Sequence, residues 1–133
     1  MKKTLAALFL ILISVSAIAD SLILNNQVSK PTNNKKYKTV IQWANSTKDV
    51  EENNIQLKEG KPLNPHSLKT ISGVGKLKIT IPKKAGYFRV LVWTKSSRDP
   101  AFLTNWVYVV PEKAYTLNKD ILIPFVLISG MGC

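Results

Sequence analysis

Hydrophobic residues along this chain alternate with polar residues far more often than they recur at helical spacing. In residues 76–81, Leu77, Ile79 and Ile81 alternate with lysine and threonine, a pattern typical of a strand with one buried and one exposed face. Segments rich in branched and aromatic residues predict further strands at Lys38–Ala44, Leu68–Ser72, Tyr87–Thr94, Phe102–Val110 and Ile121–Ile128. Two weaker candidates are Ser21–Val28 and Ile55–Leu57. Six to eight short strands favour an all-β sandwich or barrel.

Helical composition is confined to one polar segment, Ser46–Asn54. Ser46 or Thr47 can serve as the cap, and acidic residues follow in the first turn, where they interact favourably with the helix dipole. We expect no more than one short turn of helix there. Two stretches with prolines and polar residues are predicted to be loops, namely Ser29–Lys36 and Gly60–Ser67.

The N-terminal residues have the pattern of an export signal. Lys2 and Lys3 precede one apolar run, and Ala17–Ala19 supplies the small-x-small site that a signal peptidase cleaves. This pattern predicts a signal peptide over residues 1–19 and a mature chain that begins at Asp20. The alternative is a membrane anchor, but the run is shorter than the about 20 apolar residues of a spanning helix and lacks a basic stop. We therefore expect an exported protein, secreted or periplasmic.

The length of the predicted mature chain indicates how many domains it forms, and its charge indicates what kind of partner it favours. Residues 20–133 are predicted to form a single β-sandwich domain, a size that can bury a core of its own. Removing Lys2 and Lys3 lowers the formal net charge from +11 to +9. Such an excess of cations favours anionic partners but says nothing about fold.

Cys133 is the only cysteine and the last residue. A single cysteine excludes a disulfide within the chain, so the core must hold without one. Two interpretations stay open: an intermolecular disulfide that makes a covalent homodimer in an oxidising compartment, or a free thiol without a role.

Residues 77–93 carry a family resemblance. Here Gly86 and Phe88 open a strand of alternating valines, Val90 and Val92, after a polar corner. The segment resembles the strand, corner and strand of immunoglobulin-like and fibronectin type III-like sandwiches. The resemblance implies an antiparallel, immunoglobulin-like sandwich of about seven strands, and it implies no function.

Catalytic and cofactor motifs are incomplete. His66 is the only histidine, so a histidine metal cluster is excluded and a catalytic triad would depend on this one ring. The stretch Gly73-Val-Gly75-Lys76 lacks the spacing of a phosphate-binding loop. The carboxylates stand in polar segments or beside cations, as surface pairs do. We expect no enzyme, no metal and no cofactor.

Cations and aromatic residues mark a predicted binding surface. If the residues at 88, 90 and 92 face inward, Arg89 and Trp93 lie on the opposite face of the strand with Tyr87 and Leu91. Residues 69–98 contain eight cations and no acid. The predicted anion-binding residues are Lys76, Lys78, Lys83, Lys84, Arg89, Trp93, Lys95 and Arg98.

The neighbouring strand adds Trp106 and Tyr108 to this outer face if Val107 and Val109 point inward. The alternative is that the three tryptophans belong to the core, where most of them are largely buried. Lysines are seldom buried, so the cations are the firmer part of the predicted surface.

Aromatic rings among cations suit phospholipid or phosphoinositide headgroups, or acidic glycans. We therefore expect an exported, non-enzymatic binding protein, an effector if a pathogen secretes it. Nucleic acid matches the charge but not an exported location. The alternative is a structural or interaction subunit that associates through the apolar strand Ile121–Ile128 or through Cys133. In that strand, Pro124 indicates either a sheet edge or a bulge.

Overall fold

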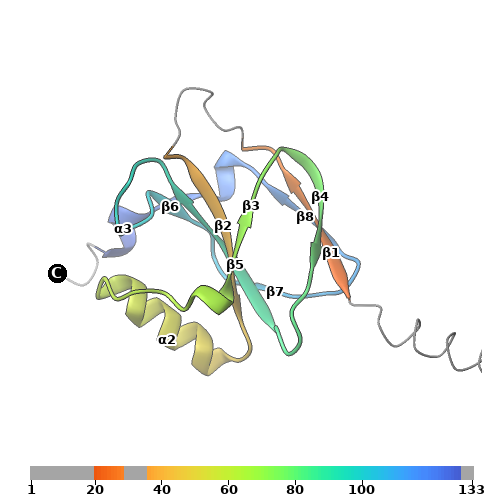
Figure 1. Ribbon diagram of the computed structural model, residues 1–133, viewed down its shortest axis with the longest axis horizontal. Coiled ribbons are helices and arrows are strands. Elements are labelled where there is room, and N and C mark those ends of the chain that lie inside the picture. The colour runs from red at the N-terminus through yellow and green to blue at the C-terminus, as the bar shows by residue number, and fades with distance from the viewer. Residues whose placement is uncertain (1–19, 29–35, 130–133) are drawn as a thin grey trace, which may run out of the picture.

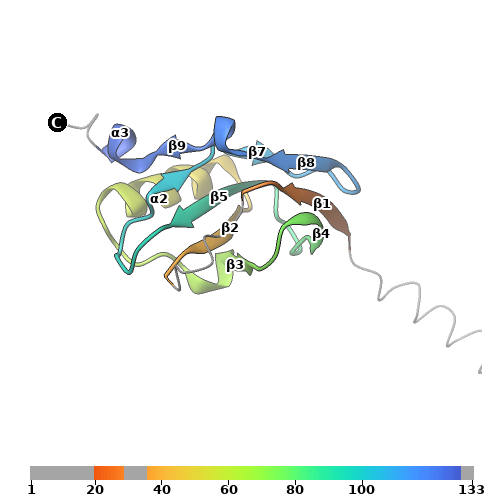
Figure 2. The same ribbon diagram turned by 90° about the horizontal axis from the view of Figure 1, so that it is seen from above.

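The computed structural model describes residues 20–28 and 36–129, which form two β-sheets and two α-helices (Figures 1 and 2). The predicted signal peptide over residues 1–19, most of the predicted loop at 29–36, and Cys133 lie outside the described residues. Within the described part, no helix is both long and apolar enough to cross a membrane. The chain is mostly β, as the hydrophobic pattern predicts.

The smaller sheet has three strands, β4 (Gly75–Thr80), β1 (Ser21–Asn26) and β8 (Ala114–Leu117), in that order. The central strand β1 is antiparallel to β4, with Leu22 opposite Ile79, and parallel to β8, with Leu24 opposite Tyr115. Leu22 and Leu24 are buried, whereas Ile23 between them is exposed. The strand therefore has the one buried face that alternation requires.

The larger sheet has six strands: β2 (Lys38–Ala44), β3 (Leu68–Ile71), β5 (Tyr87–Trp93), β6 (Phe102–Leu103), β7 (Val107–Tyr108) and β9 (Ile123–Pro124). Their order is β3-β2-β5-β6-β9, and β7 also pairs with β5. β2 and β5 form an antiparallel ladder from Lys38 opposite Trp93 to Ala44 opposite Tyr87. Pro124 lies on the edge strand β9, which is where a residue without an N–H is tolerated.

One face of the larger sheet packs against the smaller sheet. Phe88 of β5 lies in this core, with its ring centroid 5.0 Å from that of Tyr115 in β8 and 5.9 Å from that of Trp43 in β2. The buried cluster contains Leu22, Leu24, Val28, Ile41, Trp43, Ile71, Ile79, Phe88, Val90, Val92 and Leu117. Both sheets thus share one core.

The other face of the larger sheet is covered by helices. The second buried cluster joins β2, β5 and β6 to α2 (Thr47–Lys58) and α3 (Phe125–Ser129). Its members are Val40, Leu57, Leu91, Trp93, Leu103 and Phe125. β5 is therefore buried on both faces: Val90 is 2% exposed on one and Leu91 0% on the other.

The helix α2 corrects two predictions. It has 12 residues instead of one turn, and Ile55–Leu57, a weaker strand candidate, belongs to it. Leu57 is buried against the sheet while Ile55 is 54% exposed. A helix with so few inward apolar residues gives little periodic signal, because its stability comes from packing and capping rather than from a broad apolar stripe.

Two predicted strands near the C-terminus are wrong in part. Phe102–Val110 is divided into the short strands β6 and β7, because Thr104 Oγ1, rather than a carbonyl, accepts the N–H of Val90 at 2.9 Å. Ile121–Ile128 continues from the 3-10 helix Lys119–Ile121 through β9 into α3. The hydrophobic pattern does not indicate β8 (Ala114–Leu117). A further 3-10 helix, Pro65–Ser67, lies at the end of the predicted loop Gly60–Ser67.

Capping fixes the start of α2. Ser46 Oγ accepts the N–H of Asp49 at 3.2 Å, and the Asp49 carboxylate accepts the N–H of Asn45 at 3.0 Å. We expect Ser46→Ala to lower the free energy of unfolding by about 1 kcal/mol, whereas Ser46→Asn should preserve it, because asparagine is an equally good cap. Urea denaturation followed by circular dichroism measures both. An unchanged midpoint for the alanine variant would contradict the assigned cap.

Candidate functional site

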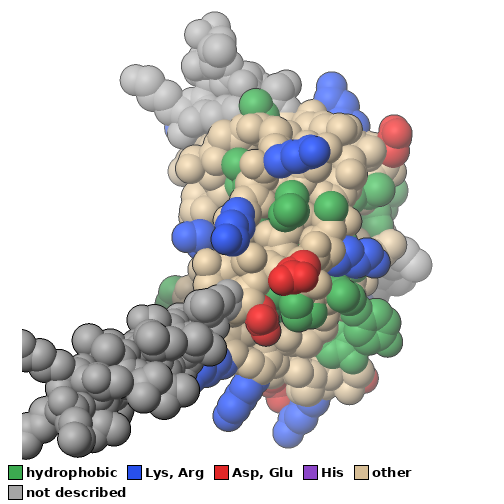
Figure 3. Space-filling view, turned by 90° about the vertical axis from the view of Figure 1, so that its right-hand side faces the viewer, with side chains coloured by type: hydrophobic (Ala, Val, Ile, Leu, Met, Phe, Trp, Pro, Cys, Tyr) green, Lys and Arg blue, Asp and Glu red, His purple; other side chains and the backbone are tan. Residues whose placement is uncertain are grey.

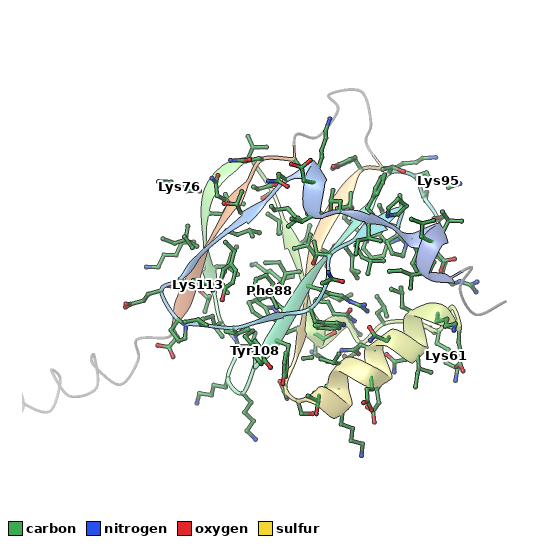
Figure 4. The ribbon with its side chains drawn as sticks, turned by 180° about the vertical axis from the view of Figure 1, so that it is seen from behind. Lys61, Lys76, Phe88, Lys95, Tyr108 and Lys113 are labelled. Atoms are coloured by element: carbon green, nitrogen blue, oxygen red, sulfur yellow. The ribbon has the colours of Figure 1, made fainter. Side chains whose placement is uncertain are left out.

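The predicted cations do not gather on one face. Lys76 and Lys78 project from β4 in the smaller sheet, and Lys76 and Lys95 lie on opposite sides of the molecule in Figure 4. Lys83 and Lys84 precede β5, whereas Lys95 follows it, so the seven residues of the strand separate them by roughly 20 Å. On the face that Figure 3 shows, cations are scattered among acidic and hydrophobic side chains.

The expectation that Arg89 and Trp93 stand on an open surface is wrong. Arg89 is 2% exposed and Trp93 8% exposed. The alternation along β5 is correct, but the face that carries them is covered by the helices α2 and α3. Trp43 is buried between the sheets, Trp106 is half-buried, and of the predicted outward aromatics only Tyr108 is strongly exposed.

Arg98 lies beside the end of α2, and its backbone carbonyl accepts the indole N–H of Trp93 at 3.3 Å. Its guanidinium lies so close to Gly60, just after the helix, that a Cβ there would be 2.7 Å from Arg98 Cζ. Gly60 has a φ of +71°, which glycine adopts without strain. Asp99 is the acidic neighbour of Arg98, at 3.8 Å.

A groove lined by lysines lies where β2 begins and β5 ends. The ladder places Lys38 opposite Trp93, and Lys38 Nζ is 4.7 Å from the centroid of the Trp93 ring. Lys95 comes from the loop after β5, in which Ser97 Oγ donates to the carbonyl of Asp99 at 2.7 Å. The groove has a volume of about 360 Å³ and is lined by Lys36, Tyr37, Lys38, Trp93, Lys95, Ser96 and Ser97. We call it the lysine groove.

The buried arginine is held by three side chains. Arg89 Nε donates to Gln42 Oε1 at 2.8 Å, and Arg89 Nη1 donates to Asn54 Oδ1 of α2 at 2.9 Å. The Trp106 ring stacks on the guanidinium, with its centroid 4.5 Å from Cζ, and Trp106 Nε1 donates to the same Asn54 oxygen at 2.9 Å. The cross-strand pairing of Arg89 with Gln42 follows from the β2–β5 register.

The charge of Arg89 is not neutralised by any described carboxylate. Burial lowers the pKa of Arg89 to about 10, which leaves the guanidinium protonated at neutral pH. Its Nη2 has no hydrogen-bond partner among the residues that the structure describes, and neither has Gln42 Nε2 beside it. Buried cations without a counter-charge are costly, so this position is unusual for a purely structural residue.

A cavity of about 250 Å³ lies at Arg89, between α2, β6 and α3. Its walls are mostly apolar, and its polar members include a second cation, Lys58. The lining residues are Asn54, Leu57, Lys58, Arg89, Leu103, Thr104, Asn105, Trp106, Phe125 and Ile128. We call it the Arg89 pocket.

His66 lies away from both of these sites. It is exposed in the 3-10 helix after Asn64, whose side chain accepts the His66 N–H at 3.0 Å. Among the described residues, no group of three or more potential metal-ligating side chains is found.

Comparison with known proteins does not assign the chain to a class: no protein-family model matches it, and neither does any curated protein.

Proposed function

We propose that this protein is an exported, non-enzymatic binding protein that attaches to anionic phospholipid headgroups through the lysine groove. The observation that carries the proposal is the placement of Lys36, Lys38 and Lys95 around one groove whose wall is Trp93. Ammonium groups attract phosphates, and each contributes about 1 kcal/mol near an anionic membrane. Trp93 is 8% exposed and forms part of the wall of the groove, so the lysines rather than the tryptophan would contact the headgroups.

The site differs from the surface expected from sequence. It keeps Lys95 and Trp93 and adds Lys36 and Lys38, which stand before and at the start of β2. The dispersed cations, Lys76 among them, contribute a long-range field that draws the protein toward anionic surfaces rather than specific contacts. The net charge of +9 for residues 20–133 supports the long-range part of this attraction.

The alternative function is that of a structural subunit that associates through an apolar strand at Ile121–Ile128. The structure does not support this route, because Ile121–Ile128 does not form one apolar strand. Val126 and Leu127 of α3 are exposed instead, at 70% and 59%. Cys133 lies outside the described residues. An intermolecular disulfide through it therefore stays a prediction.

We also propose that the two sheets form an immunoglobulin-like sandwich. The corner between β4 and β5 carries the chain from one sheet to the other, as the resemblance of residues 77–93 implies. Two features depart from the simple pattern: α2 stands between β2 and β3, and β8 runs parallel to β1.

The proposal is tested by co-sedimentation with vesicles. The protein purified after expression of the full sequence should bind vesicles that contain phosphatidylserine or a phosphoinositide. It should not bind vesicles of phosphatidylcholine alone. Binding should weaken between ionic strengths of about 0.01 and 1 M, because the Debye length falls from about 30 to 3 Å. Lys36/Lys38/Lys95→Ala should weaken binding by about 100-fold, the effect of about 3 kcal/mol.

The matched control is Lys76/Lys78/Lys113→Ala, which removes the same charge from other parts of the surface. It should weaken binding by less than the groove variant. Equal losses would show that only the overall charge matters. Retention on an acidic polysaccharide without capture by any vesicle would overturn the lipid assignment.

A further inference from the structure

Arg89 has binding capacity that the surrounding protein leaves unused. Its Nε and Nη1 have acceptors in Gln42 and Asn54, but Nη2 has none among the described residues. The side chain is 2% exposed but lines the Arg89 pocket, so a group that enters the pocket lies beside the guanidinium. A buried donor of a charged group favours an acceptor that also carries charge.

Two further donors stand in the same pocket. Asn54 Oδ1 already accepts from both Arg89 and Trp106. This fixes the orientation of the amide, since only its oxygen can accept from two N–H groups, and leaves Nδ2 as a donor. Lys58, one helical turn further along α2, lies on the same side of the helix and lines the pocket.

Most of the remaining wall is apolar, although Thr104 and Asn105 also line it. Leu103 of β6 and Phe125 of α3 are buried, and Ile128 of α3 contributes a half-buried side chain. The volume of about 250 Å³ exceeds the about 150 Å³ of an engineered cavity that binds benzene. There is room for an apolar group of ring size together with an anionic end.

We propose that the Arg89 pocket binds a small carboxylate with an apolar body, the carboxylate facing Arg89, Asn54 and Lys58 and the body facing Leu103 and Phe125. The ligand class follows from the combination: one guanidinium and one ammonium suit a single anionic group, and the apolar walls suit an aryl or alkyl chain. This site is separate from the lysine groove and goes beyond the proposed function.

The simpler interpretation is that Arg89 only ties α2 to the sheet. Its hydrogen bond to Asn54 and its stacking on Trp106 would serve that role. This interpretation predicts no ligand, and it explains neither the unpartnered Nη2 nor the second cation at Lys58. The experiment therefore must report on ligand contact at the pocket rather than on stability.

The test is a nuclear magnetic resonance titration of the protein, expressed from the full sequence, with 3-phenylpropionate. The indole N–H signals of Trp106 and Trp93 report separately on the two sites. Trp106 lines the Arg89 pocket, whereas Trp93 lines the lysine groove. We expect the Trp106 indole signal to shift saturably while that of Trp93 stays in place. The neutral analogue 3-phenylpropanol should bind about tenfold more weakly, because it lacks the charge-assisted hydrogen bond.

Two charge-reversal variants at exposed lysines of α2 and one variant of Arg89 itself localise the carboxylate. Lys58→Glu, at an exposed position, should weaken 3-phenylpropionate binding by about tenfold. Lys48→Glu makes the same charge change on α2 about 15 Å away along the helix and should leave binding unchanged. Arg89→Gln should abolish binding if its thermal unfolding shows that it folds. No shift of Trp106, equal binding of the alcohol, or equal effects of the two lysine variants would overturn the proposal.

Discussion

Replacing Phe88 by alanine should lower the free energy of unfolding by about 3–5 kcal/mol. Phe88 is 3% exposed and lies at the centre of the shared core in Figure 4, where its ring contacts Trp43 of the larger sheet and Tyr115 of the smaller one. Its removal leaves a cavity between two sheets, neither of which can move freely to fill it. Chemical denaturation followed by tryptophan fluorescence measures the loss.

Tyr108→Ala is the matched control for Phe88. Tyr108 is an aromatic residue of similar size in β7, but it is 70% exposed. Its ring packs at a tilt against Tyr87, with 5.2 Å between ring centroids, so we expect a loss of less than about 1 kcal/mol. Similar losses for the two variants would be incompatible with a core between the sheets.

Replacing Leu91 by alanine should cost about 2–5 kcal/mol, for a different structural reason. Leu91 is fully buried on the opposite face of β5, in the cluster with Leu57 of α2 and Phe125 of α3. Its loss should loosen the helices more than the sheet–sheet contact. Amide hydrogen exchange should show a larger fall in protection along α2 for Leu91→Ala than for Phe88→Ala.

Ile55→Ala provides the control for Leu91. Ile55 lies on α2 but is 54% exposed, so its replacement should change stability by no more than about 0.5 kcal/mol. In the double variant, the losses at Phe88 and Leu91 should add to within about 0.5 kcal/mol, because the two side chains belong to separate clusters. Strong coupling would mean that the two cores are not independent.

Local sequence was sufficient to predict most of the strands that form the cores. The side chains of 76–81 alternate and those of 87–93 are apolar except for Arg89, and the structure has strands at both places. Period two reports directly on strand geometry, since successive side chains point to opposite faces. The alternation of side chains does not show whether a helix or another strand covers the outer face of a sheet.

The misassigned segments show where local pattern is insufficient. The run Ile121–Ile128 is apolar without interruption, and such a run does not distinguish a strand from a buried helix. Pro124 lacks an N–H, and the Phe125 N–H bonds to the carbonyl of Ala101 at 2.9 Å as the chain turns into α3. For α2, Ser46 correctly indicates where the helix begins. The polar residues that follow show no apolar periodicity, so the sequence does not indicate how long the helix is.

The sites depend on pairings between distant residues. Lys38 and Lys95 are 57 positions apart and meet only because β2 pairs with β5 in this register. Arg89 is the one charged residue within the apolar segment 87–93, and Gln42 is the polar residue in the middle of β2. These two residues are the sequence signal for a buried polar pair, but alternation along one strand does not show that a helix covers the face on which they lie.

The parallel pairing of β1 with β8 has a consequence for the order in which the molecule can be completed. Ile23 pairs with Ala114, and β8 ends at Leu117. A chain that is synthesised N-terminus first holds β1 without one of its two partners until β8 has also been made. The smaller sheet can therefore be completed only after the whole larger sheet up to β7 has been synthesised.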